Sequence, residues 1–409
     1  MRPEISPSRL IGRVFDLGRI GALEGGGVCR LALTDADRAG RDWLVAQMEA
    51  LGLTVSIDAI GNIWGIRPGA QDGPPVMIGS HIDSVATGGL YDGALGVLAG
   101  LEVVAALNAA GLQTRHPVAV AAFTNEEGAR FAPDMMGSGV HQGALDLDEM
   151  LATRATDGSA VVGEELDRIG YRGTAAPITP AAYLELHVEQ GPVLEQEGIR
   201  IGAVTGVQGI HWTEFTVTGQ TNHAGTTPMA LRRDAGQVAA RIAVAADRIA
   251  AENGPPQVAT VGVFELSPGL VNVVPEQARL TVDLRNTDGA VLEAAGDRLL
   301  DEAEAASRAA GCTLAHRPLA RFAPVAFDDG LVGKIEAAAR ARQFSVKRMP
   351  SGAGHDAQMF APNCPTAMVF IPSAKGLSHN INEHSEEDDI VAGAQVLLDV
   401  VCDLAGGQA

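Results

Sequence analysis

Side chains able to bind metal or transfer protons follow two apolar runs in the first third of the chain. Residues 75–80 read as a strand that leads into His81 and Asp83, and a glycine-containing loop then reaches Asp92. The continuous apolar run 118–123 is typical of a strand buried on both faces, and Glu126 and Glu127 follow it. Ligands of open α/β sheets gather at the carboxyl ends of strands, so these segments are expected to converge.

Two further histidines, His187 and His384, lie in segments that are expected to reach the same place. Imidazole and carboxylate ligands without thiols suit divalent cations such as Zn²⁺, Mn²⁺ or Co²⁺. Asp83, two residues after His81, is placed to accept the second imidazole N–H and so determine the tautomer. Of two adjacent glutamates, one can hold a metal while the other takes a proton from water.

Each of these residues, taken alone, also has a purely structural interpretation. A single histidine at a strand end is more often hydrogen-bonded within the protein than bound to metal. Asp92 before a glycine is equally typical of a turn or a helix cap, and Glu126 with Glu127 of a solvated surface pair. Because the two glutamates follow a buried strand, however, they require a counter-charge. The combination of segments therefore favours a metal site.

The elements that position these residues change character along the chain. The first half alternates strand and helix patterns, which predicts a mostly parallel sheet covered on both faces. From about residue 209 the order is β-α-β-β-α-β, the split βαβ or ferredoxin-like unit, and the α/β pattern resumes after Pro324. We therefore predict an α/β domain over residues 1–209 and 325–409, interrupted by an α+β domain over residues 210–324.

Composition narrows the class of protein. The 409 residues include 30 Lys+Arg and 50 Asp+Glu, a formal charge of −20 that disfavours nucleic acid and anionic membrane surfaces as partners. The four cysteines are scattered and predict neither a disulfide framework nor a thiolate metal site. Without an apolar run typical of a signal peptide near residue 1, a cytoplasmic location is expected. Neither a Walker A loop nor a G-x-S-x-G elbow is present.

Seven segments spread over nearly the whole chain carry a specific resemblance. They are Gly79-Ser-His-Ile-Asp-Ser84, Gly88-Gly-Leu-Tyr-Asp-Gly93, Phe123-Thr-Asn-Glu-Glu-Gly-Ala-Arg-Phe131, Glu185-Leu-His-Val-Glu-Gln-Gly191, Asn222-His-Ala-Gly-Thr-Thr-Pro228, Ser351-Gly-Ala-Gly-His-Asp356 and Ser378-His-Asn-Ile-Asn-Glu-His384. Together they resemble the M20 metallopeptidase-like amidohydrolases. The branch that they resemble holds N-carbamoyl-L-amino-acid amidohydrolases (L-carbamoylases), allantoate amidohydrolases and β-ureidopropionases.

This resemblance implies a site for two divalent metal ions (Zn, Mn, Co or Ni). Glu126 would be the general base, and the metal-binding residues would be His81 and His187 for one ion, Glu127 and His384 for the other, and Asp92 as the bridge. The histidine at position 187, where the wider peptidase family has a carboxylate, is typical of this branch.

The resemblance also implies that the inserted domain is a lid that forms a homodimer interface. His223 would stabilise the developing oxyanion, and Asn272 and Arg285 would bind the substrate carboxylate. Arginine suits that task because its planar fork pairs with both carboxylate oxygens. Gln190 and Gln208 match polar positions on the substrate side.

The reaction that the resemblance implies is hydrolysis of the ureido C–N bond of N-carbamoyl-L-amino acids, small ureido-carboxylate substrates, to L-amino acid, CO₂ and ammonia. Allantoate amidohydrolase and β-ureidopropionase activities are the alternatives, because their substrates also combine a ureido group with a carboxylate. Aminoacylase or peptidase activity, or a metal-binding protein without turnover, is less favoured.

Overall fold

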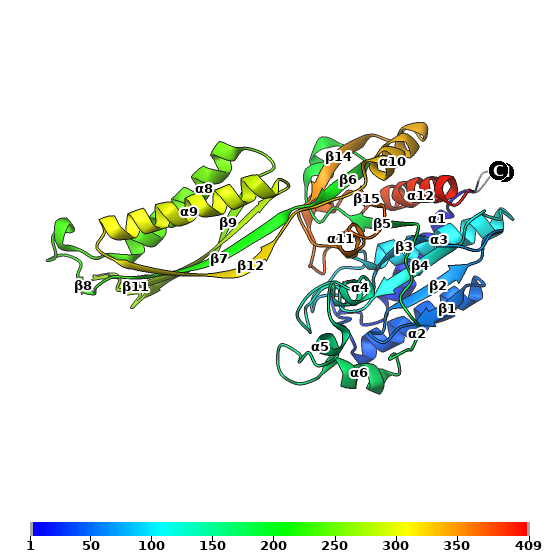
Figure 1. Cartoon of the computed structure of the whole chain (residues 1–409), viewed down its shortest axis with the longest axis horizontal. Helices are drawn as coiled ribbons and strands as arrows, with labels where there is room; N and C mark the ends of the chain where they lie inside the picture. The colour runs from blue at the N-terminus through cyan, green and yellow to red at the C-terminus, as the bar shows by residue number, and fades with distance from the viewer. Residues whose placement is uncertain (1–2, 407–409) are drawn as a thin grey trace. The chain divides into compact units, whose positions relative to one another are not determined.

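The computed structural model describes residues 3–406, whose contacts divide the chain into two compact units. The discontinuous unit runs to Thr205 and resumes at Ala326, and the inserted unit is Gly206–Val325. Each unit has its own sheet and its own helices (Figure 1).

The discontinuous unit is built on a mixed sheet. Among residues 3–406, nine strands form this sheet in the order β1-β2-β4-β3-β5-β15-β6-β13, with β14 pairing with β6. The neighbours β4, β3, β5 and β15 are parallel, which confirms the predicted α/β class. The strand bounds are β1 Thr54–Ile57, β2 Ile63–Arg67, β3 Val76–His81, β4 Val118–Phe123, β5 Ala182–Val188, β6 Ile201–Val207, β13 Val325–Ala326, β14 Val346–Ser351 and β15 Thr366–Ile371.

Helices bury the parallel strands of this unit, and every residue of β3, β4, β5 and β15 is buried. Helix α3 is apolar on all sides and lies within the core; its one acid, Glu102, is paired with Arg9 and Arg13. The helix bounds are α1 Pro7–Gly18, α2 Asp35–Ala50, α3 Ala94–Ala109, α4 Met136–His141, α5 Leu147–Leu151, α6 Val162–Ile169, α7 Val193–Glu197, α10 Asp329–Ala341, α11 Asp356–Phe360, η2 Ala374–Gly376 and α12 Glu387–Leu404.

The inserted unit has the predicted split βαβ order. Within residues 206–325, all of them described, four antiparallel strands are ordered β12-β7-β11-β9, and α8 and α9 bury apolar side chains such as Ile242 and Leu299 against them. Figure 1 shows both helices on one face of this sheet. The bounds are β7 Gly209–Thr218, β8 Asn222–His223, η1 Met229–Leu231, α8 Ala235–Asn253, β9 Val258–Ser267, β10 Val273–Val274, β11 Gln277–Asn286, α9 Gly289–Ala309 and β12 Thr313–Phe322.

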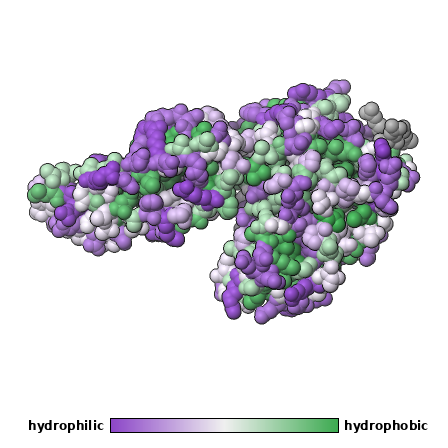
Figure 2. Space-filling view, viewed as in Figure 1, coloured by the Kyte–Doolittle hydropathy of each residue, from purple (hydrophilic) through white to green (hydrophobic). Residues whose placement is uncertain are grey.

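Hydrophilic residues cover much of the visible surface of each unit, with hydrophobic residues between them (Figure 2). Across residues 3–406, no helix has the length and apolar character that crossing a bilayer requires.

Candidate active site

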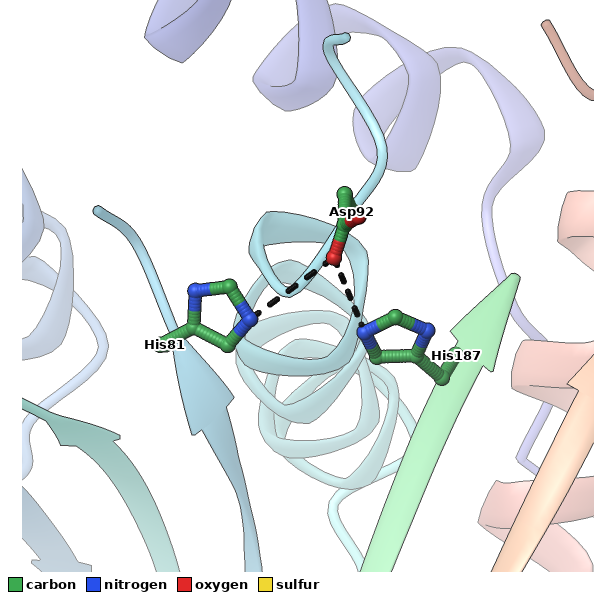
Figure 3. Close-up of side chains that lie close together, drawn as sticks. All are labelled: His81, Asp92 and His187. Atoms are coloured by element: carbon green, nitrogen blue, oxygen red, sulfur yellow. Dashed lines mark ion pairs between the residues drawn. The ribbon is translucent and has the colours of Figure 1, made fainter. Parts of the chain in front are cut away.

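Three residues meet where β3 and β5 end and α3 begins. His81 is the last residue of β3, His187 lies near the end of β5, and Asp92 precedes α3. One carboxylate oxygen of Asp92, Oδ1, lies 3.7 Å from His81 Nε2 and 3.2 Å from His187 Nε2 (Figure 3). All three side chains are buried. The convergence expected from the strand ends is therefore present.

Backbone carbonyls orient both imidazoles. His81 Nδ1 lies 3.0 Å from the carbonyl oxygen of Asp83, and His187 Nδ1 lies 2.8 Å from that of Val188. A ring that donates from Nδ1 keeps the lone pair of Nε2 available for a metal ion. Both Nε2 atoms face Asp92, and that of His187 also accepts the Gly93 N–H at 3.1 Å, a bond that a metal ion at this point would replace.

The other oxygen of Asp92 faces a second group. His379 Nε2 lies 3.4 Å from Asp92 Oδ2 and 3.3 Å from Glu127 Oε2. Ligand atoms of Asp92, Glu127 and His379 lie within 4.8 Å of one another, as do those of His81, Asp92 and His187. The Asp92 carboxylate thus joins two groups, each able to hold a cation.

The structure differs from the sequence prediction at His384. This residue is half-exposed, and its Nε2 lies 3.5 Å from Glu386, outside both ligand groups. His379, five residues earlier in the same segment, has a left-handed backbone with φ 53°. That turn directs its imidazole toward Asp92, which also accepts a 3.0 Å hydrogen bond from Ser378 Oγ. The segment was found from its sequence, but which of its two histidines faces the site was not.

The Asp83 side chain holds the two glutamates after β4, whereas the sequence analysis expected it to accept the second imidazole N–H of His81. The Asp83 carboxylate accepts the backbone N–H groups of Glu126 and Glu127, both at 3.3 Å, and its Oδ1 is 3.9 Å from His81 Nδ1. The carbonyl of Asp83, and not its side chain, therefore receives the imidazole N–H. Glu126 Oε2 lies 3.3 Å from His81 Nε2, beside the first ligand group but outside it.

Electrostatics show that these acids need positive charge. Burial raises the pKa of Glu126 well above its ordinary value, and the charges of Asp356, Glu127 and Asp92 add to this. Burial and the Asp92 charge likewise raise the pKa of Glu127 to about 8. Divalent cations would supply the missing counter-charge, so the residues present fit a metal site.

Hydrogen bonds from imidazoles have the opposite effect on Asp92. Burial raises the pKa of Asp92, but bonds from His187 and His379 outweigh burial and hold it well below its ordinary value. Burial lowers the pKa of His187, yet its hydrogen bond to Asp92 outweighs this and raises it to about 9. Without metal, protons on the imidazoles and carboxyl groups of the site therefore take the place of the positive charge that cations would supply.

A second layer of buried polar groups supports His187. The ring of His355 packs edge-on against the His187 ring at 4.5 Å between centroids, and His355 Nε2 lies 2.8 Å from Ser351 Oγ. Glu185 accepts hydrogen bonds from Ser80 Oγ at 2.8 Å and from the Ala357 N–H at 3.0 Å. His355 belongs to a motif singled out in the sequence, but its type and spacing alone did not indicate this supporting position.

A cavity of about 120 Å³ opens beside these groups. Gln190 lines it, and its Nε2 donates to Asp92 Oδ2 at 2.9 Å and to Ser378 Oγ at 3.2 Å. Its predicted role on the substrate side stays a prediction. Gln190 Oε1 is buried and has no hydrogen-bond partner within residues 3–406. The lining residues are Asp92, Glu126, Glu127, Asp134, His187, Gln190, Ala353, Gly354, His355 and His379.

The predicted substrate-side residues of the inserted unit have local partners. His223 lies exposed on β8, and its Nδ1 accepts backbone N–H groups of Gly225 at 3.0 Å and Thr226 at 3.2 Å. Arg285 on β11 pairs with Asp283 at 2.9 Å, and its guanidinium stands over the Trp212 ring.

The other two predicted residues of this unit form one hydrogen bond through a side chain and one through the backbone. Gln208 Nε2 donates to the Pro256 carbonyl at 3.2 Å. Asn272 is exposed, and its carbonyl accepts the Ala224 N–H at 2.9 Å. The catalytic and binding roles of all four residues stay predictions.

Comparison with known proteins places this arrangement in a family. The model of Peptidase family M20/M25/M40 matches residues 77–403. An N-carbamoyl-L-amino-acid amidohydrolase of Rhizobium meliloti is 41% identical, covering 98% of this chain and 97% of the relative. A ureidoglycolate hydrolase of Arabidopsis thaliana is 35% identical, covering 90% of this chain and 80% of the relative.

Solved structures agree. The crystal structure of a hydantoinase/carbamoylase family amidase from Burkholderia multivorans is similar, with a TM-score of 0.96, 43% identity and 98% of each chain covered. The chain therefore belongs to the M20 family, within its hydantoinase/carbamoylase group of amidases.

Proposed function

We propose that the protein hydrolyses the ureido C–N bond of N-carbamoyl-L-amino acids and releases L-amino acid, CO₂ and ammonia. The observation that carries this proposal is the Asp92 carboxylate, whose two oxygens face two separate groups of metal-binding side chains, with Glu126 beside them. The full-length similarity to the R. meliloti amidohydrolase supports the choice of substrate.

Two divalent cations would be held by His81, His187 and Asp92 on one side and by Asp92, Glu127 and His379 on the other, where they would supply Lewis acidity and activate a water. Glu126 is not needed as a ligand and is free to take the proton of the attacking water. It then returns that proton to the departing nitrogen, so one carboxylate serves as base and then as acid.

The inserted unit supplies the remaining functions in this proposal. Arg285 and Asn272 bind the substrate carboxylate, and His223 stabilises the oxyanion; removing such a donor typically costs about 3–4 kcal/mol of barrier. The unit also forms a homodimer interface. Mass measurement of the purified protein in solution tests this, and a monomer at all concentrations would contradict it.

Ureidoglycolate is a second candidate substrate, favoured by the similarity to the Arabidopsis enzyme. Allantoate and 3-ureidopropionate share the same chemistry, a carboxylate beside a ureido group. Since all four compounds would use the same metal ligands and the same arginine, the choice among them depends on contacts with the rest of the substrate.

Steady-state kinetics on the protein reconstituted with Mn²⁺ or Zn²⁺ distinguish these candidates. The substrates are N-carbamoyl-L-methionine, ureidoglycolate, allantoate and 3-ureidopropionate, with N-acetyl-L-methionine as the control for aminoacylase activity. We expect the highest kcat/KM for N-carbamoyl-L-methionine. A tenfold higher value for another ureido acid would replace the proposed substrate, and hydrolysis of the acetyl compound alone would contradict ureido chemistry altogether.

A further inference from the structure

One carboxylate in the cavity has no part in metal binding or proton transfer. Asp134 lines the cavity together with Glu126 and Gly354, and it belongs to neither ligand group. It lies in the loop between β4 and α4, beyond the motif 123–131 that carries Glu126 and Glu127. Its place in the cavity therefore calls for a separate function.

The loop that carries Asp134 is held firmly. The Asn125 side chain donates to the carbonyls of Phe131 at 2.8 Å and Pro133 at 3.1 Å. Gly128 has φ +62°, and a Cβ there would come within 2.9 Å of the backbone of Asp134. Because the loop packs this closely on Gly128 and is bonded to Asn125, the backbone at Asp134 has little freedom to move away from the cavity.

The Asp134 carboxylate lacks a donor from the rest of the protein. Asp134 is an exposed residue; within the described residues, its hydrogen bonding is confined to its own backbone N–H, and partial desolvation raises the pKa of its carboxyl. Gln190 Oε1, which lines the same cavity, is also an acceptor without a partner among residues 3–406. The cavity thus presents one buried acceptor without a partner, Gln190 Oε1, and one solvent-exposed acceptor, the Asp134 carboxylate, and a ligand that offers N–H donors could bond both.

We propose that Asp134, together with Gln190, accepts the N–H groups of the terminal –NH₂ of the ureido substrate and so selects carbamoyl over acyl groups. This inference rests on the proposed function and deepens it. A carbamoyl –NH₂ offers two N–H donors, whereas an acetyl methyl offers none, so Gln190 Oε1 stays unpaired and Asp134 receives no hydrogen bond from the ligand. Sites built to bond an N–H discriminate strongly against analogues that lack it. Repulsion between Asp134 and the substrate carboxylate orients the ureido end toward this side of the cavity.

The test compares Asp134→Ala with the wild-type enzyme on two ligands. The kcat/KM for N-carbamoyl-L-methionine and the competitive Ki of N-acetyl-L-methionine are measured, together with thermal unfolding. We expect kcat/KM for the carbamoyl substrate to fall roughly 10- to 100-fold, the loss typical of a hydrogen bond to a charged group. The Ki of the acetyl compound stays the same or decreases. Asp134→Asn, which keeps one acceptor oxygen, recovers part of the loss.

Asp72→Ala in the exposed connection between β2 and β3 is the matched control, and it leaves both constants unchanged. A twofold or smaller change in the carbamoyl kcat/KM of Asp134→Ala would overturn the inference and leave the proposed function standing. Equal losses for both ligands would also overturn it, since they indicate a general defect. So would an effect confined to substrates with a cationic side chain, such as N-carbamoyl-L-lysine. A wild-type enzyme inactive on every ureido acid would end both proposals.

Discussion

Gly93→Ala tests the geometry of the site most directly. Gly93 follows Asp92 and has φ +61°, and a Cβ built there would lie 2.2 Å from His81 Nε2. The two nearest ring carbons of His81 would be 2.3 and 2.4 Å away. The added methyl group therefore falls on the nitrogen that we assign to metal binding.

The size of the effect follows from these distances. An ordinary contact is about 3.5 Å, so the methyl group and the ring must separate by about 1.3 Å. Metal–ligand distances tolerate only about 0.2 Å, and a displacement of about 1 Å at a catalytic centre costs roughly 100-fold in rate. We expect kcat/KM to fall at least about 100-fold and the affinity for the first metal ion to fall with it.

Gly111→Ala is the matched control, because Gly111 also has φ +61° but a Cβ added to it would meet no atom within 4 Å. Both variants place a side chain on a backbone with positive φ, which costs about 1–2 kcal/mol in the left-handed helical region. Gly93 has ψ −52°, outside that region, so Gly93→Ala is expected to lose more unfolding free energy, and thermal unfolding of both variants measures this separately from metal binding. Calorimetric metal titration, metal content after dialysis, and kinetics on N-carbamoyl-L-methionine distinguish them. If Gly93→Ala matched Gly111→Ala in metal content and kcat/KM, our assignment of His81 as a ligand would be wrong.

Three further predictions concern the same groups. Glu126→Gln is expected to keep both metal ions, measured by elemental analysis, while kcat falls by about 10²–10⁴; wild-type turnover would exclude Glu126 as the base. His379→Ala is expected to retain one metal ion per chain, and His384→Ala is expected to retain two. The reverse pattern would support His384 as the ligand, as the sequence analysis predicted. Burial raises the pKa of Glu127 to about 8, and the hydrogen bond to Asp92 raises the pKa of His379 to about 9, so protons compete with metal below these values. Metal affinity in titration calorimetry should therefore rise with pH from 6.5 to 9 and then level off, with proton release on binding; a pH-independent affinity would contradict the assigned ligands.

Much of the architecture is a local property of the sequence. The all-apolar runs of β3 and β4 indicate strands buried on both faces, and the polar residues that follow them mark the carboxyl edge of the sheet. Parallel strands bring those edges together whatever the details of packing, so His81, Asp92, Glu126 and His187 were predicted to meet, and they do. The inserted unit was predictable for the same reason, because its order of elements defines its sheet.

Only the tertiary structure decided how the loops meet. His379, and not His384, faces Asp92 in the structure because the 378–383 segment is bound to the loop before α3. Ser378 donates to Asp92, and the Glu383 carboxylate accepts the Tyr91 and Asp92 N–H groups at 3.0 and 3.1 Å. These bonds join residues almost 300 positions apart, and no local pattern encodes such contacts. Residue types and spacing along the chain therefore indicated the chemistry of the site, while long-range hydrogen bonds between loops determined which side chains face it.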